Sequence, residues 1–179
     1  MKARLSPHRP PVDPESTARS ISVIQLRAMT DTEFVAFETG LIQDYAQDIA
    51  RNHKVPLDEA RAEAQQQIAG LLPDGSDSRN QQLFTIVPDA TQEAAGYLWC
   101  QVEAEKQRAF ICEIQIFDRY RSHGYGTAAL RELEHRLRTA SIRRVGLHVF
   151  GDNTRAQALY RQLGYRVTGM EMQKELGDQ

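Results

Sequence analysis

The sequence predicts one α/β domain of the α+β kind, in which about four helices flank a mixed, mostly antiparallel sheet. Two observations favour this fold class. Three apolar stretches of strand length occur between residues 83 and 117, and short polar connections join them, as in an antiparallel meander. After residue 124, stretches with helical spacing alternate with strand-like stretches, which indicates crossover connections. The length of 179 residues is sufficient for one domain with a sizeable core.

Residues 1–20 are expected to form a flexible arm, followed by a domain that occupies residues 21–179. The arm holds four of the seven prolines of the chain and few apolar groups. Because it cannot bury enough apolar surface to offset the entropic cost of ordering, we expect it to stay outside the fold.

The first half of the domain has recognisable helix signals. Thr30 and Glu33 have the spacing of a capping box, and Pro56 and Pro73 bracket a second helix. The expected elements are a strand at 21–26, a helix after Thr30 that ends near Arg51, a helix at 57–72, a polar loop at 75–81, and strands at 83–87, 95–102 and 108–117.

The second half has signals of the same kind. Asn153 suits the N-cap of a helix, and Gly164 suits its end. The expected elements are a helix from the glycine pair to about Ala140, a strand at 144–150, a helix from Asn153 to Gly164, and two strands at 165–167 and 170–176 that complete the sheet.

A glycine-containing stretch, residues 119–130, carries the clearest chemical signal. Gly124 and Gly126 allow close approach of the backbone to a ligand, at the start of a helix whose free N–H groups and dipole attract anions. Arg119, Arg121 and His123 add cationic groups there. The stretch therefore predicts a phosphate or pyrophosphate site.

Two families of loop fit this pattern to different degrees. The dinucleotide fingerprint G-x-G-x-x-A matches from Gly124 to Ala129, but its first glycine should follow the strand directly, and an acid should stand about twenty residues on. Six residues separate Phe117 from Gly124, and the later position holds Arg143 and Arg144. Arg121, Gly124 and Gly126, at R-x-x-G-x-G spacing, match a second family better.

That second pattern resembles the acyl-CoA loop of the GNAT superfamily of N-acetyltransferases. A second block agrees, because residues 153–165 resemble the family segment N-x-x-A-x-x-L-Y-x-x-L-G-F/Y. The resemblance implies transfer of an acetyl group from acetyl-CoA to an amine in a ternary complex, without a metal. The alternative is a GNAT domain that binds acyl-CoA without catalysis. Family positions imply a cofactor-binding set of Gln115, Ile116 and Phe117 through backbone N–H groups, then Arg121, His123, Gly124, Tyr125, Gly126, Thr127 and Asn153.

The resemblance also implies three catalytic candidates. Tyr160 matches the tyrosine that faces the sulfur of CoA, although it could instead fill core volume on its helix stripe. The base that neutralises the amine is either His148, five residues before Asn153, or Glu113 on the strand before the loop. His148 could equally be structural, and Glu113 a solvent-facing strand residue. Asn153 could be both a helix cap and a pantetheine contact.

Charge and composition limit the partners. The net charge of −2 gives no attraction to nucleic acid, no apolar run is long enough for a membrane span, and the N-terminus has no secretory signal. We expect a cytoplasmic monomer or homodimer with two reduced cysteines, Cys100 and Cys112. The histidines show no metal-ligand spacing with these cysteines. A basic cluster at Arg136, Arg138, Arg143 and Arg144 is either a contact for the CoA 3′-phosphate or a solvated helix face.

The acceptor is expected to be a small-molecule or peptide amine. Residues 30–63, in the first two helices, contain eight acids and three lysines or arginines. These acids either line the side of the site that binds the acceptor, where they would favour a cationic amine, or form the solvated faces of the two helices.

Overall fold

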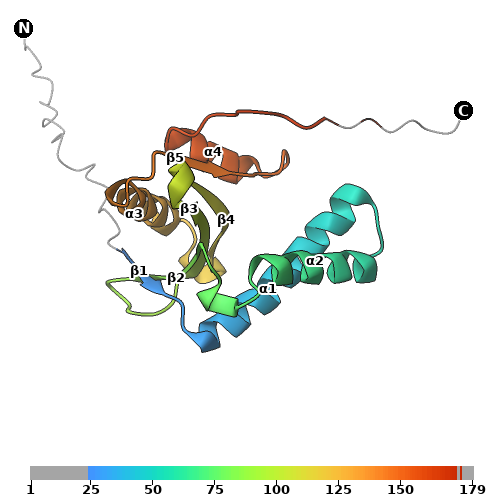
Figure 1. Ribbon diagram of the computed structural model, residues 1–179, viewed down its shortest axis with the longest axis horizontal. Coiled ribbons are helices and arrows are strands. Elements are labelled where there is room, and N and C mark those ends of the chain that lie inside the picture. The colour runs from blue at the N-terminus through green and yellow to red at the C-terminus, as the bar shows by residue number, and fades with distance from the viewer. Residues whose placement is uncertain (1–23, 173, 175–179) are drawn as a thin grey trace, which may run out of the picture.

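A computed structural model describes residues 24–172 and 174, and shows one sheet with helices on both faces (Figure 1). The five strands follow each other in the order β1-β2-β3-β4-β5, and every neighbouring pair is antiparallel except β4 and β5, which are parallel. The predicted class, a mixed and mostly antiparallel sheet with four α-helices, is confirmed. The strands are β1 Ile24–Ala28, β2 Gln81–Pro88, β3 Gly96–Glu103, β4 Arg108–Ile116 and β5 Arg144–Leu147.

The four helices divide between the two faces of the sheet. They are α1 Asp31–His53, α2 Leu57–Leu71, α3 Tyr125–Thr139 and α4 Thr154–Gln162. The apolar side of α3, including Leu130 and Leu133, is fully buried against Ile86 and Leu98, and α4 adds Leu159 to this cluster. On the other face, α1 and α2 pack against the aromatic side chains of β3. Figure 1 shows α3 and the α1–α2 pair on opposite sides of the sheet.

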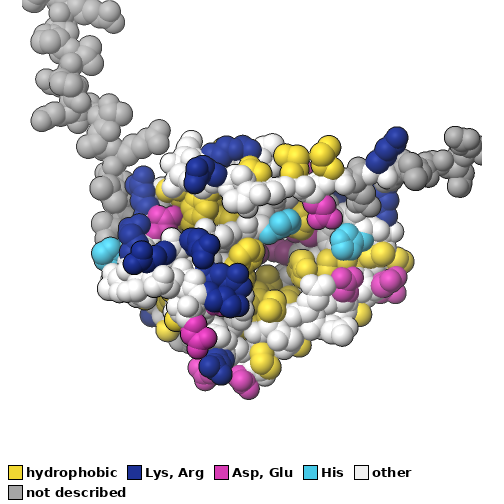
Figure 2. Space-filling model, turned by 45° about the horizontal axis from the view of Figure 1, so that its top comes forward, with side chains coloured by type: hydrophobic (Ala, Val, Ile, Leu, Met, Phe, Trp, Pro, Cys, Tyr) yellow, Lys and Arg dark blue, Asp and Glu magenta, His cyan; other side chains and the backbone are white. Residues whose placement is uncertain are grey.

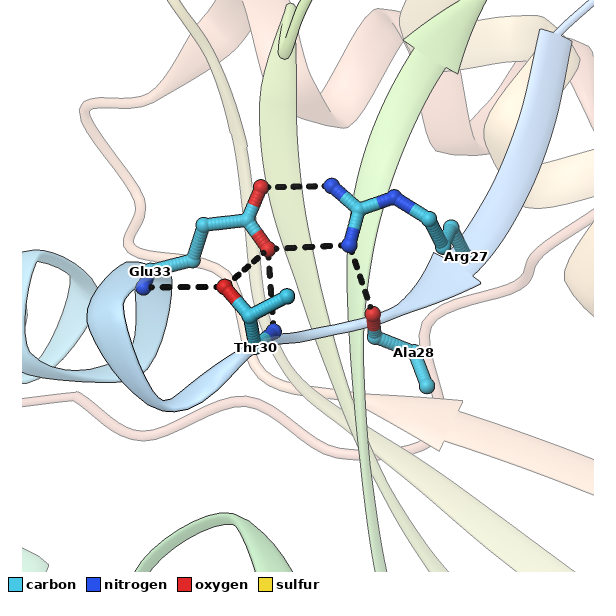
Figure 3. A network of polar contacts seen from close by, with 4 residues as sticks. All are labelled: Arg27, Ala28, Thr30 and Glu33. Carbon is cyan, nitrogen blue, oxygen red and sulfur yellow. Dashed lines mark hydrogen bonds and ion pairs between the residues drawn. The ribbon is translucent and has the colours of Figure 1, made fainter.

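The predicted capping box at the start of α1 is present (Figure 3). The Thr30 hydroxyl accepts a hydrogen bond from the Glu33 amide, and the Glu33 carboxylate accepts from the Thr30 amide at 2.9 Å. Arg27 of β1 donates two hydrogen bonds to the same carboxylate. Partial burial raises the pKa of Glu33, but the bonds from Arg27 and Thr30 outweigh it and hold the pKa at about 2. The cap therefore joins the first strand to the first helix.

The close approach of β3 and β4 depends on a glycine. A Cβ at Gly96 would collide with the carbonyl oxygen of Gln115, so no other residue fits there without a shift of the backbone. Farther along the same pair, Trp99 faces Glu113 and Cys100 faces Ile111, so Cys112 is an extra residue in β4, a β-bulge. The bulge lies in the middle of the strand that carries one candidate base.

Several predicted boundaries are wrong. The expected strands at 165–167 and 170–176 are absent from the described residues 165–172 and 174, and the expected strand at 144–150 already ends at Leu147. Alternating apolar residues favour a strand only where a sheet edge accepts them, whereas Val167, Met170 and Met172 are 67%, 78% and 86% exposed.

Smaller differences concern the loops and the N-terminus. The expected polar loop at 75–81 contains the short 3-10 turn Gly75–Asp77, and two further turns occur at Ala104–Lys106 and Asp118–Tyr120. The expected arm at 1–20 and the first residues of the expected strand at 21–26 lie outside the described residues. Among the helices that the structure describes, none has the length and apolar character needed to cross a bilayer.

Candidate active site

An open groove of about 2010 Å³ runs across β4, between α1 and α2 on one side and α3 and α4 on the other. Every predicted site residue except Phe117 lines it. Figure 2 shows the hollow near the centre of the molecule, with Lys and Arg side chains to its left and Asp and Glu side chains to its right. The two ends of the groove therefore differ in charge.

One end of the groove is formed by the glycine loop. Gly124 has φ of 82°, a left-handed conformation that favours glycine, and it is the N-cap of α3. The first turn of α3 contains no acidic residue and no side chain caps it. Since Ala128 makes the first backbone hydrogen bond of the helix, to the Gly124 carbonyl, the amides of Tyr125, Gly126 and Thr127 precede the helical pattern. This helix end suits an anion.

Arg121 and His123 shape the loop before α3. The Arg121 Nε donates to the Ile116 carbonyl at 3.1 Å, and its guanidinium forms an ion pair with Asp118 at 2.8 Å. His123 contacts the Arg121 carbonyl through Nδ1 at 2.8 Å, and its ring stacks on Tyr125. Arg121 therefore ties the loop to the end of β4 as well as placing positive charge at this end of the groove.

The edge of β4 opens in the middle of the groove. β5 pairs with β4 only as far as Ile111. Alternate amides of a strand point to opposite edges, and the Phe117 amide donates to Ala95, on the β3 side, at 2.9 Å. The amides of Ile114 and Ile116 consequently point to the open edge. The carbonyl of Ile116 points the same way, because Arg121 contacts it from outside the sheet.

The direction of each amide distinguishes the three positions, Gln115, Ile116 and Phe117, at which the sequence predicts backbone donors to the cofactor. Ile116 has its amide on the open edge. The Gln115 amide points toward β3, although the Gln115 side chain lines the groove, and Phe117 packs its ring on Tyr97 at 5.1 Å between centroids. Sequence reasoning missed Ile114, which the two-residue period of the strand could have identified once the direction of one amide was known.

Tyr160 and Asn153 reach the groove from the two ends of α4. The Asn153 side chain accepts a hydrogen bond from the Ala156 amide at 3.1 Å, which confirms that it is the N-cap. Tyr160 is half-buried, with its ring 5.6 Å from that of Tyr165. Burial raises the pKa of Tyr160, and the charge of Glu113 raises it further. The hydroxyl of Tyr160 therefore keeps its proton at neutral pH and can donate a hydrogen bond.

Glu113 lies half-buried on the floor of the groove. Burial raises its pKa to about 7. A hydrogen bond from the Ile114 amide opposes this rise, and the negative charges of Asp44 and Asp48 on α1 add to it. A carboxyl group with this pKa can accept a proton near neutral pH. His148, the other candidate base, is exposed on the segment after β5, and its ring meets Phe150 edge-on at 5.1 Å. Both candidates line the same groove.

The end of the groove opposite the glycine loop is polar and largely acidic. Gln115 of β4 donates to the Asp44 carboxylate at 3.4 Å, and the Tyr45 hydroxyl donates to Gln67 of α2 at 2.7 Å. Asp48 forms an ion pair with Arg51 at 3.2 Å. Sequence reasoning noted the acidic surplus of these helices but could not select these residues, because spacing along α1 does not show which acids meet β4.

Other candidates lie away from the groove. The arginines of the basic cluster are absent from its lining, and Arg136 pairs instead with Glu132 on its own helix. Cys100 and Cys112 are both free thiols, and burial raises their pKa values to about 12 and about 11. Among the described residues, no group of His, Cys, Asp and Glu side chains is arranged to hold a metal ion.

Comparison with known proteins points in one direction. Residues 31–165 match the model of the Acetyltransferase (GNAT) family. YdgE of Bacillus subtilis (strain 168), described as an uncharacterized N-acetyltransferase, is 31% identical over 153 residues, which cover 84% of this chain and 97% of YdgE. YycN of the same organism, described in the same way, is 31% identical over 155 residues, covering 86% of this chain and 99% of YycN.

Solved structures share the fold. The crystal structure of YycN superposes with a TM-score of 0.82 and 30% identity, and covers 87% of this chain and all of YycN. The PaiA N-acetyltransferase of Thermoplasma acidophilum, solved in complex with coenzyme A, has a TM-score of 0.62 over 83% of this chain and 93% of its own. At 13% identity, the second likeness concerns the fold alone.

Proposed function

Since this chain belongs to the Acetyltransferase (GNAT) family, we propose that it transfers an acetyl group from acetyl-CoA to a primary amine. The proposal rests on one observation. A single groove contains an uncapped helix start at a glycine loop, an open strand edge, a tyrosine hydroxyl and a carboxyl group of raised pKa. Each of these four features answers one chemical need of the reaction.

The glycine end is the proposed binding site for the pyrophosphate of acetyl-CoA. The amides of residues 125–127 would donate to phosphate oxygens, and the positive end of the α3 dipole favours the negative charge. Arg121 would act mainly by holding the loop, because its guanidinium already pairs with Asp118 and its Nε contacts Ile116. Asn153 caps α4 beside the same groove, and its role toward the pantetheine arm stays a proposal.

The open edge of β4 is the proposed site for the thioester. The Ile116 amide, on the open edge, would donate to the thioester carbonyl oxygen, where negative charge develops during attack, and the Ile114 amide, which also contacts the Glu113 carboxyl group, would donate to the pantetheine arm. One fixed donor of this type contributes roughly 3 kcal/mol to transition-state stabilisation in favourable cases. Because the backbone supplies these donors, side-chain substitutions at the two positions should affect the reaction only through packing.

Glu113 is the proposed base and Tyr160 the proposed hydrogen-bond donor to the leaving group. The amine nitrogen forms a bond to the acetyl carbon, the carbon–sulfur bond breaks, and the amine loses a proton to Glu113, directly or through water. The Tyr160 hydroxyl donates to the sulfur as it becomes a thiolate. We favour Glu113 over His148 because Glu113 lies on the groove floor with a pKa of about 7, whereas His148 is exposed.

The test is release of free CoA thiol from acetyl-CoA, measured with the full chain and a panel of amines near pH 8. We expect thiol release that depends on an amine, with a matching amount of N-acetyl product by mass spectrometry. Acetyl-CoA binding in a thermal-shift assay without thiol release for any amine would instead support an acyl-CoA-binding protein. Absence of acetyl-CoA binding would contradict both.

A further inference from the structure

The loop before α3 contains two residues in the left-handed conformation. Ser122 has φ of 66° and Gly124 has φ of 82°. Glycine adopts this conformation readily, whereas a residue with a side chain does so at a cost in free energy. Such a residue persists where the surrounding structure holds it. The contacts that hold this loop are therefore part of what makes the proposed pyrophosphate site.

One of these contacts comes from the hairpin between β2 and β3. The hydroxyl of Tyr120, two residues before Ser122, donates a hydrogen bond to the Glu93 carboxylate at 2.7 Å. Arg119 pairs with the same carboxylate at 3.4 Å, and its guanidinium lies over the Tyr120 ring, 4.7 Å from the centroid. Tyr120 lines the groove, whereas Glu93 and Arg119 do not. The carboxylate of Glu93 therefore supports the loop from outside the groove.

The hairpin that carries Glu93 is itself bonded to the end of β4. The Ala95 amide donates to the Ile86 carbonyl at 2.8 Å and closes the hairpin. The Ala95 carbonyl accepts from the Phe117 amide at 2.9 Å. Glu93 and Tyr120 consequently form a second connection between two segments whose backbones are already joined, so the carboxylate has a fixed position relative to the glycine loop.

The Tyr120 ring extends this support to the start of α3. Tyr120 is 9% exposed, and its ring meets the Tyr125 ring edge-on at 6.2 Å between centroids. Tyr125 stacks in turn on His123, with 5.8 Å between the ring centroids. Tyr125 is the first residue of α3, and its amide is one of the proposed phosphate donors. A continuous series of contacts thus runs from Glu93 to the backbone amides of the glycine end.

We propose that Glu93 is a positioning residue for the cofactor, which acts through Tyr120 to hold the glycine loop against the end of β4 and thereby strengthens binding of the pyrophosphate part of acetyl-CoA. This inference rests on the proposed function, because it adds a residue to the same site. The residues of the loop determine the turn that it makes, and the contact with Glu93 determines where that turn lies. The two partners are 27 positions apart in the sequence.

The dissociation constant of CoA, measured by calorimetry, tests the proposal. Tyr120→Phe and Glu93→Ala should each weaken CoA binding about threefold to tenfold, the net effect of one hydrogen bond. The double variant should bind CoA no more weakly than the weaker single variant, because both substitutions remove the same contact. Glu93→Gln should stay within about twofold of the native affinity, because its amide oxygen still accepts from the Tyr120 hydroxyl.

An acid in the same hairpin is the matched control. Asp89 is exposed, and its contact with Gln92 is made by the backbone carbonyl, which a substitution keeps. Asp89→Ala removes the same charge as Glu93→Ala and should bind CoA with native affinity. An equal loss of affinity in both variants would make the effect one of net charge and overturn the inference. Native affinity in Tyr120→Phe would overturn it as well.

Hydrogen exchange of the protein without ligand, followed by mass spectrometry, measures the loop directly. Peptides that cover residues 119–127 should exchange at least about threefold faster in Glu93→Ala than in the native protein at short exchange times, whereas peptides from α1 and α2 should keep the native rate. An unchanged rate in residues 119–127, or an equal acceleration of all peptides, would overturn the inference.

Neither measurement requires an acceptor, which keeps this inference separate from the proposed transfer. A protein that binds CoA but releases no thiol with any amine contradicts the transferase proposal alone. In that case, weaker CoA binding and faster exchange in Glu93→Ala still support the role of Glu93, and native values of both quantities still overturn it.

Discussion

The two ends of the groove are built from different chemical groups. The glycine end offers backbone amides from the start of α3. The acidic end offers side chains, and contacts between distant parts of the chain hold them in place, such as Gln115 with Asp44 across 71 positions and Arg51 with Asp152 across 101. The first end requires a local backbone conformation, whereas the second requires correct tertiary packing.

This difference has consequences for both recognition and evolution. Backbone donors are insensitive to side-chain identity, so one loop conformation can hold the same cofactor in proteins of low overall identity. Side chains at the acidic end can be exchanged one at a time without loss of the fold. We therefore expect the glycine end to bind the common substrate of the family and the acidic end to determine which amine is accepted.

The largest predicted effect is at Glu113, the proposed base, which lies beside Asp44 and Asp48 of the acidic end. Glu113→Gln should lower kcat/KM by roughly 10²- to 10⁴-fold, because the amide cannot accept the proton of the amine. The carboxylate is the active form and its pKa is about 7, so kcat/KM of the native protein should rise as the pH increases through 7. This rise, the limb of the pH profile near pH 7, should be absent in the variant. The rise due to the amine itself, at higher pH, should remain in both.

His148 provides the comparison for this experiment. His148→Asn should keep the limb near pH 7 and most of the activity, because His148 is exposed and is not the proposed base. A profile that loses its limb in His148→Asn but keeps it in Glu113→Gln would reverse the assignment of the base.

The next effect in size concerns the glycine end. A Cβ at Gly126 would lie 3.7 Å from the Ile116 side chain and 3.8 Å from Leu159, so the branched side chain of valine would fill the space where α3 approaches the open edge of β4. Gly126→Val should weaken acetyl-CoA binding by about a hundredfold, or ~3 kcal/mol. The measurement is the dissociation constant by calorimetry, with circular dichroism to show that the variant is folded.

A glycine on the acidic side is the matched control. A Cβ at Gly70 of α2 would meet no neighbouring group within 4 Å, so Gly70→Val should bind acetyl-CoA with native affinity. Equal affinities in Gly126→Val and the native protein would contradict the assignment of the glycine loop.

The predictability of the two ends from sequence follows the same division. The cap at Thr30, the glycine loop and the cap at Asn153 are local features, in which residues a few positions apart determine the backbone, and all three appear where the sequence predicts them. A site made of backbone amides therefore depends mainly on residues that are close together in the sequence. For that reason the glycine end and α4 can be identified from the amino-acid sequence alone.

Features that depend on pairing between distant segments could not be predicted. The open edge exists because β5 stops pairing with β4 at Ile111, and the bulge at Cys112 leaves no mark in the spacing of apolar residues. The sequence places Phe117 among the donors, but its amide already donates to Ala95. The alternation at residues 165–172 likewise predicts strands, because an apolar pattern does not reveal whether a sheet edge is available.

A smaller effect is expected at Tyr160, where the leaving group meets α4. Tyr160→Phe should lower kcat roughly tenfold to a hundredfold, since a hydrogen bond to a charged group contributes about 1.5–3 kcal/mol. Acetyl-CoA affinity should change little, because the sulfur becomes charged only during transfer. Steady-state kinetics and calorimetry separate the two quantities, and Tyr165→Phe serves as the control because Tyr165 does not line the groove. Native turnover in Tyr160→Phe would make Tyr160 a packing residue.

The smallest predicted effect is on stability, and it should occur at the acidic end only. The folded-state pKa of Glu113 is about 7, above its ordinary value of 4.5, so the unfolded chain releases this proton at lower pH than the folded protein does. Raising the pH from 5 to 8 therefore favours unfolding, and the native protein should lose stability that Glu113→Gln retains. One pKa unit corresponds to about 1.4 kcal/mol, and partial exposure of the carboxyl reduces the expected difference to about 1–2 kcal/mol at pH 8.

Urea unfolding of both proteins at pH 5 and pH 8 measures this difference, with Asp58→Asn, a substitution at an exposed position at the start of α2, as the charge-matched control. The backbone donors of the glycine end do not titrate, so Gly126→Val should show the same pH dependence as the native protein. A native protein and a Glu113→Gln variant that lose equal stability between pH 5 and pH 8 would show that Glu113 is not held in a low-dielectric site.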